Sequence, residues 1–322
     1  MPTKIQPAIT TLSLRTDPTG SSSYLNYVDT ARELSKVNRR LYSQSRMYGY
    51  QGLSFIWRQN ASSLATIECT VRTAGNTWIV QNAHTKGEAL WNEMQALVLE
   101  DNPSIAGKWH DFKVQLDSNQ IVSREMLARD GGGNPYAGGE WNISTYVMPQ
   151  HEVHPSGPDA GKPLPAEEFS VTLIGADTST KRSLVKAYEE SRATLNPNTP
   201  NVPAGMALSF FNLLTDSGSQ EPELATVIEA EGNNPPYDLD NYPGSGTNAP
   251  DPATVAYAAI SSTEVDGHIG PFIAPCGLLQ IEIKGYDAAG AAIAAAQMPD
   301  IDILLHVAPG SYKGVAAVPM GQ

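Results

Sequence analysis

The sequence predicts an all-β fold, namely a jelly-roll β-sandwich with helical insertions and long loops. The chain of 322 residues holds 27 glycines and 24 prolines, about one residue in six, which indicates many turns. Short apolar runs with period-two alternation lie between these turns. Several loops run to about 10–20 residues, which a sandwich can carry at its ends. Two tandem β-barrels are the alternative.

The individual elements follow from hydrophobic periodicity. Apolar residues recur at three and four from Val28 to Leu41, after a possible cap at Asp29 or Thr30, which predicts a helix over 28–43. The same reasoning places helices at 84–101, 180–195 and 222–231. Alternating β-branched and aromatic runs predict strands. They are 8–16, 50–58, 63–73, 76–83, 108–117, 140–149, 167–176, 205–215, 253–263, 270–285 and 301–319.

Two regions differ in charge and organisation. We expect an N-terminal strand and basic amphipathic helix at 1–49, followed by a jelly-roll domain at 50–322 with a possible sub-lobe at 128–250. Residues 1–130 carry 14 basic and 12 acidic side chains, whereas residues 131–322 carry 7 and 22. The acidic part repels nucleic acid and anionic membranes. No apolar run is long enough to predict a membrane span.

The sequence lacks the common catalytic and metal-binding motifs. GxSxG, GxxxxGK[ST], GxGxxG and HExxH are all absent. The only close histidine pair, HEVH at 151–154, lies between Pro149 and Pro155 and is expected in a solvated loop. Cys69 and Cys276 are expected to be buried and unbridged. This pattern favours a structural protein over an enzyme.

Basic residues interleaved with Tyr42 and Tyr48 form the candidate nucleic-acid contact. Cations beside aromatic rings are typical of single-strand binding, although an amphipathic helix with a charged outer face produces the same pattern. The candidate residues are Arg32, Lys36, Arg39, Arg40 and Arg46.

The stretch EGNNPPYDLDNYPG, at 231–244, is the candidate subunit contact. Pro235 and Pro236 hold the backbone extended, so that Tyr237 and Tyr242 become semi-rigid anchors at an interface. The carboxylates of Asp238 and Asp240 offer hard oxygen ligands for Ca²⁺, with a solvated turn as the alternative. No other cofactor is expected.

Five segments carry a resemblance to a known group of proteins. The chain resembles the jelly-roll capsid proteins predicted in environmental circular single-stranded DNA viruses. The segments are ELSKVNRRLYSQSRMYGYQGLSF, NTWIVQNAHTKGEALWNEM, KWHDFKV, the PPYD…YPG loop and FIAPCGLLQIEI.

The resemblance implies a coat protein of the virion that self-assembles into an icosahedral shell, without enzyme activity. Its partners would be other copies of itself and packaged nucleic acid, bound weakly and without sequence preference. The chain departs from many small capsid proteins because only Lys4 and Arg15 precede residue 32, so an arginine-rich arm is missing. A carbohydrate-binding or adhesive β-sandwich, with Tyr136, Tyr237 and Tyr242 exposed, is the alternative function. A cupin-like enzyme is a third, but its clustered histidines are not present.

Overall fold

The computed structural model describes residues 7–16, 24–57, 64–148, 158, 162, 167–192, 252–261, 263–264 and 266–321. Within these ranges the chain forms mostly antiparallel β-sheets with few helices, which confirms the predicted all-β class at that level. It divides into two compact units. Unit 1 comprises 1–77, 119–142 and 252–322, and unit 2 comprises 78–118 and 143–251. In the described ranges no helix has both the length and the apolar character to cross a membrane.

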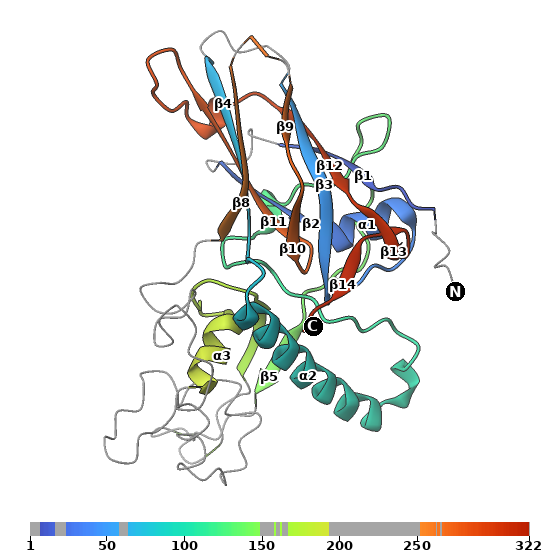
Figure 1. Cartoon of the computed structure of the whole chain (residues 1–322). Coiled ribbons are helices and arrows are strands. Elements are labelled where there is room, and N and C mark those ends of the chain that lie inside the picture. Colours follow the sequence, from blue (N-terminus) through green and yellow to red (C-terminus); the bar gives the residue numbers. More distant parts are fainter. Residues whose placement is uncertain are drawn as a thin grey trace. The chain divides into compact units, whose positions relative to one another are not determined.

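The first sheet of unit 1 contains six strands (Figure 1). They are β1 (Thr11–Arg15), β3 (Arg46–Trp57), β9 (Asp266–Ile269), β10 (Phe272–Pro275), β12 (Ile301–Val307) and β14 (Ala317–Pro319). Their order is β1-β12-β3-β10, with β9 and β14 also paired to β3, and every pairing is antiparallel. The long strand β3 therefore organises this sheet.

The second sheet of unit 1 contains four antiparallel strands. They are β2 (Leu25–Asp29), β4 (Thr66–Thr73), β8 (Ala253–Ser261) and β11 (Leu278–Tyr286), in the order β2-β11-β4-β8. The two sheets together pair strands in a nested way: β1 with β12, β2 with β11, β3 with β9 and β10, and β4 with β8. Unit 2 is inserted between the neighbouring strands β4 and β8.

The two sheets of unit 1 enclose one hydrophobic core. Alternate residues of each strand point inward, as in β12, where Ile301, Ile303 and Leu305 are fully buried and the residues between them are partly exposed. Phe55 of β3 and Ile281 of β11 belong to the same core from the two sheets. This alternation is the period-two pattern that the sequence shows.

Helix α1 (Thr30–Asn38) and the strand β13 (Pro309–Tyr312) complete unit 1, with 3₁₀ turns at Val122–Arg124 and Ala295–Gln297. The predicted boundary at residue 50 is wrong, because it falls inside β3 and both α1 and β1 belong to the sandwich. The predicted sub-lobe at 128–250 begins too early. Residues 128–142 return to unit 1, where Ala128, Tyr136 and Trp141 pack on its core.

Unit 2 combines two helices with a small mixed sheet. Its described elements are α2 (Trp78–Asp101), α3 (Leu184–Arg192), β5 (Thr145–Met148), β6 (Glu167–Thr172) and β7 (Lys181–Ser183), with a 3₁₀ turn at Pro103–Ile105. β5 and β6 pair antiparallel, and β6 and β7 pair parallel. The core includes Phe112, Tyr146 and Phe169, whose rings contact one another in sequence.

Several predicted elements differ from the structure. The strand expected at 76–83 is the first part of α2, because Ile79, Ala83, Gly87 and Leu90 are buried at helical spacing, a pattern longer than the short β-branched run. The segment 108–117 forms no regular strand: Phe112, Lys113 and Val114 are buried in succession, and Gln115 makes an isolated bridge to Thr172. β2 and β9 were not predicted. The strand expected at 270–285 is two strands joined by a tight turn at Cys276 and Gly277, where φ is 57° and 66°.

Candidate nucleic-acid interface

The N-terminal part of the basic segment forms a buried ion-pair cluster. Asp29 caps α1 by accepting a 3.0 Å hydrogen bond from the backbone N–H of Arg32. Glu33, fully buried, accepts from Arg32 Nε at 2.7 Å and from Lys36 Nζ at 3.0 Å. Its second oxygen accepts the N–H of Ala128 at 2.8 Å. Arg32 and Lys36 are therefore neutralised within the fold.

A third carboxylate, Glu125, completes this cluster by pairing with Arg32. Burial opposes the charge of Arg32, but Asp29, Glu33 and Glu125 together raise its pKa. Burial also raises the pKa of Asp29 to about 6, although Arg32, Gln44 and Trp141 oppose that rise. Nucleic acid could reach Arg32 or Lys36 only by displacing these carboxylates.

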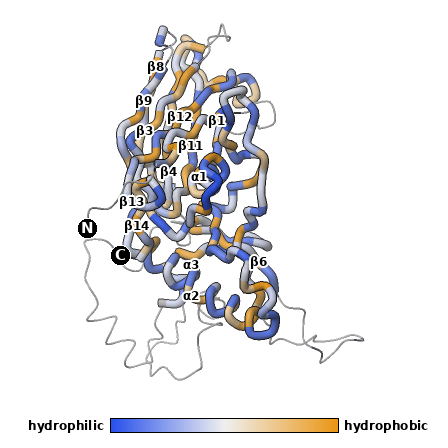
Figure 2. Tube along the Cα trace, turned by 90° about the vertical axis from the view of Figure 1, so that its right-hand side faces the viewer, coloured by the Kyte–Doolittle hydropathy of each residue, from blue (hydrophilic) through white to orange (hydrophobic). Residues whose placement is uncertain are grey.

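The C-terminal end of the same segment is exposed. α1 ends at Asn38, and Arg39 adopts a left-handed backbone with φ 52°. This sharp turn directs the chain away from the helix, and Arg39 and Arg40 are both exposed. Arg40 Nη1 donates a hydrogen bond of 3.3 Å to the carbonyl of Pro7. In Figure 2 the tube along α1 is mostly hydrophilic, in contrast to the strands of the core.

A turn from the other end of the chain brings further basic and aromatic groups to this place. Lys313 donates to the carbonyl of Leu41, which fixes the end of β13 beside the loop that follows α1 (Figure 1). Its Nζ lies 5.2 Å from the centroid of the Tyr312 ring and 5.9 Å from that of Tyr42. The guanidinium of Arg46 lies over the ring of Tyr312 at 3.7 Å. These distances are in the range of cation–π contacts.

We call Arg39, Arg40, Arg46, Tyr312 and Lys313 the basic–aromatic patch. Within the described ranges no carboxylate pairs with any of its four cations, in contrast to Arg32 and Lys36. Guanidinium and ammonium groups that lack a carboxylate partner bind phosphates, and a tyrosine ring beside them can stack on a base. The patch is therefore chemically suited to the backbone and bases of a single strand.

Sequence reasoning found three members of this patch and missed two. Tyr312 and Lys313 lie about 270 positions from Tyr42, so their approach depends on the pairing of β1 with β12 and on the turn after β13. The sequence pattern that could have indicated these two residues is the tripeptide Tyr312-Lys313-Gly314. In the structure it forms a tight turn, with Lys313 and Gly314 at φ 50° and 98°. A basic and an aromatic residue at a tight turn indicate an exposed contact point, but not its neighbours.

Comparisons with protein-family models, with curated proteins and with solved structures found no match for this chain.

The candidate subunit contact and calcium ligands lie outside the described residues. They are Pro235, Pro236, Tyr237, Asp238, Asp240 and Tyr242. The two cysteines are free and buried, as expected.

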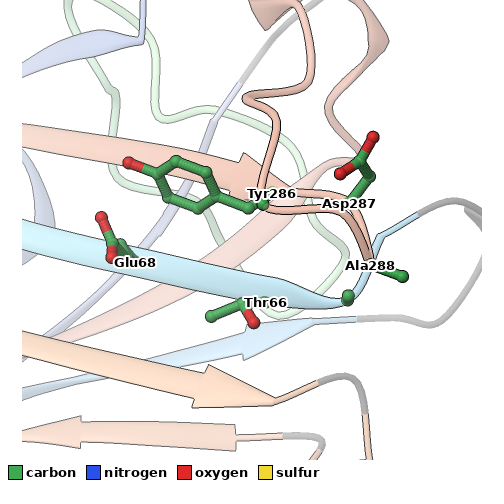
Figure 3. Close-up of a pocket in the computed structure, with 7 residues that line it drawn as sticks. Thr66, Glu68, Tyr286, Asp287 and Ala288 are labelled. Atoms are coloured by element: carbon green, nitrogen blue, oxygen red, sulfur yellow. The ribbon is translucent and has the colours of Figure 1, made fainter.

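A shallow depression lies at one end of the second sheet, where β4 begins and β11 ends (Figure 3). Tyr286 and Glu68 lie side by side across these strands, and Thr66 and Asp287 complete much of the lining. The hydroxyl of Tyr257 on β8 donates to Glu68 at 3.1 Å. A hydrogen bond with Glu68 raises the pKa of Tyr286. This combination of phenol rings and a carboxylate could bind polyhydroxyl groups.

Proposed function

We propose that the protein is a viral capsid subunit, with unit 1 as a jelly-roll barrel that self-assembles into a closed icosahedral shell. The nested strand pairing carries this proposal. A jelly roll places eight antiparallel strands in two sheets. In this arrangement early strands pair with late strands, and the successive pairs are nested inside one another. The pairs β1–β12, β2–β11, β3–β10 and β4–β8 follow this rule. Capsid proteins are among the proteins that use this architecture.

Exposed apolar side chains support subunit contacts. On α2 of unit 2, Leu97 and Val98 are 65% and 42% exposed. On unit 1, Tyr257 and Ile273 are exposed to a similar extent, each on a different strand. Single exposed apolar residues are normal, and burial of these side chains in a subunit contact would remove apolar surface from water. A shell repeats one set of such contacts around its symmetry axes.

The basic–aromatic patch supports a packaging role within this proposal. Its cations would bind the phosphates of a packaged single strand. Four cations per subunit give a modest salt dependence, so each contact is weak and sequence-independent. Many copies on the inner surface of a shell would bind the genome collectively.

Electron microscopy combined with size-exclusion chromatography tests the assembly. The purified full chain is expected to form closed particles of uniform diameter, at least under one condition of salt and pH. Leu97→Asp with Val98→Asp should shift the protein to smaller species while circular dichroism stays unchanged. Persistent monomers of the unaltered protein under all conditions would refute a capsid role.

A carbohydrate-binding β-sandwich is the second candidate, favoured by the depression around Tyr286 and Glu68. Aromatic rings contact the apolar faces of sugars, while carboxylates accept hydrogen bonds from their hydroxyl groups. A glycan array with the unaltered protein and with Tyr286→Ala tests this reading. Monomers that bind a glycan only when Tyr286 is present would favour it over the capsid proposal.

A further inference from the structure

Two histidines lie on the outer face of the first sheet, on strands remote in the sequence. His306 of β12 is directly opposite Gly52 of β3, and His268 of β9 is opposite Ser54 of β3. Both histidine side chains are accessible to solvent. Because Gly52 and Ser54 are two residues apart, they present to the same face of the sheet. Only β3 separates the two histidine strands, and its residue opposite His306 has no side chain.

Gly52, the residue opposite His306, leaves room for the ring of His268. The pairing of β12 with β3 shifts register between His306 and Val307, which marks a β-bulge at this point. A Cβ atom at Gly52, where φ is 149°, would collide with the carbonyl oxygen of Ile269 and lie 3.3 Å from Cε1 of His268. The imidazole of His268 therefore occupies the space that a larger residue at 52 would take. A bulge of this kind often re-aims side chains at functional sites.

Both imidazoles are oriented by a hydroxyl group. Thr11 Oγ1 lies 3.2 Å from Nδ1 of His306, and Ser54 Oγ lies 3.2 Å from Nδ1 of His268. When Nδ1–H donates to the hydroxyl, the lone pair remains on Nε2. Histidines that bind metals are commonly oriented in this way through their second nitrogen. In that tautomer both rings present the same atom, Nε2, to a ligand.

We propose that His268 and His306 form a two-histidine site for a borderline divalent transition metal such as Zn²⁺, with the two Nε2 atoms as ligands. Imidazole nitrogen suits zinc, copper and nickel better than calcium or magnesium. Among the described residues no group of three or more histidine, cysteine or acidic side chains is placed to hold a metal. The site therefore leaves two positions of a tetrahedral zinc ion for water or for groups from another molecule.

Isothermal titration of the untagged full chain with ZnCl₂ tests the site, at a pH above the usual histidine pKa of about 6.5. The unaltered protein is expected to bind zinc, and His268→Gln with His306→Gln to remove that binding. Thr11→Val or Ser54→Ala should weaken it by about tenfold or more, because each frees one ring to rotate. Circular dichroism of every variant verifies that the fold persists.

The matched control removes the two histidines that are close to each other in the sequence, with His151→Gln and His154→Gln. Zinc binding that survives the control and disappears in the His268/His306 variant supports the site. Equal binding by the His268/His306 variant and the unaltered protein, or no binding by the unaltered protein, overturns it. With Cu²⁺ as the probe, electron paramagnetic resonance should show two nitrogen ligands, and a signal from one nitrogen would contradict shared coordination.

Discussion

The two ends of the basic segment 32–46 have the same kind of side chain and opposite environments. Arg32 and Lys36 are about one-tenth exposed and are paired with Glu33. Arg39 and Arg40 are exposed beyond the end of α1. The difference shows that a cation's sequence neighbours do not decide its role. The carboxylates that reach it through the fold decide whether it stabilises the protein or remains available for a ligand.

The largest effect is expected at the paired end, from Glu33→Gln. The buried carboxylate accepts from Arg32, Lys36 and the N–H of Ala128, and its loss leaves two poorly solvated cations without their shared partner. We expect the free energy of unfolding to fall by about 3–5 kcal/mol. Urea denaturation followed by circular dichroism measures it. The exposed Glu93→Gln should change stability by less than about 0.5 kcal/mol, and equal effects would show that the cluster is not stabilising.

The next effect concerns pH and Asp29. Burial raises the pKa of Asp29 to about 6 in the folded protein, above its ordinary 3.8, so the folded state binds this proton more tightly than the unfolded state. Asp29 therefore adds stability that is fully present below about pH 4 and is lost as pH rises through 6. A shift of about two pKa units corresponds to roughly 3 kcal/mol.

Asp29→Asn should remove this contribution to the pH dependence. Asparagine caps a helix about as well as aspartate, so the N–H of Arg32 keeps an acceptor. Denaturation midpoints at several pH values between 4 and 8 compare the variant with the unaltered protein. An unchanged difference in stability between pH 4 and pH 8 would contradict a raised pKa at this position.

The exposed end should govern binding rather than stability. Arg39→Ala with Arg40→Ala is expected to reduce the slope of log K against log salt concentration by about 1.4 for a single-stranded oligonucleotide, since two phosphate contacts are lost. Fluorescence anisotropy at several salt concentrations measures the slope. Lys36→Met should leave it unchanged because Lys36 is paired with Glu33. An equal decrease of the slope in the Arg39/Arg40 variant and in the Lys36 variant would contradict the distinction between the paired and the exposed end of the segment.

A control for net charge sharpens this result. Lys108→Ala with Arg124→Ala removes the same charge from positions outside the basic–aromatic patch. Binding that depends on total charge would fall equally in the control and in the Arg39/Arg40 variant. Binding at the patch would fall only in the latter.

The sequence predicted the β class, most strands and the basic segment because these depend on local periodicity. It could not show which cations are free, because Glu125 lies 93 positions from Arg32 and Lys313 lies about 270 positions from Tyr42. The strand predicted at 76–83, where α2 begins, was wrong for a related reason. The β-branched residues at 79–80 fit a strand locally, whereas the buried stripe that favours a helix extends to Leu90 and Trp91. Long-range pairing therefore supplies the information that composition and spacing lack.

The smallest effect separates the two parts of Tyr312. Its hydroxyl accepts the backbone N–H of Ser43 at 3.0 Å, while its ring lies under Arg46 and near Lys313. Tyr312→Phe keeps the ring and should cost only about 1 kcal/mol of stability, with oligonucleotide affinity nearly unchanged. Tyr312→Leu removes the stacking surface and should weaken affinity by about 1–3 kcal/mol. If both variants bind equally well, the ring is a support for Arg46 and Lys313 rather than a platform for bases, and the exposed end of the segment would act through charge alone.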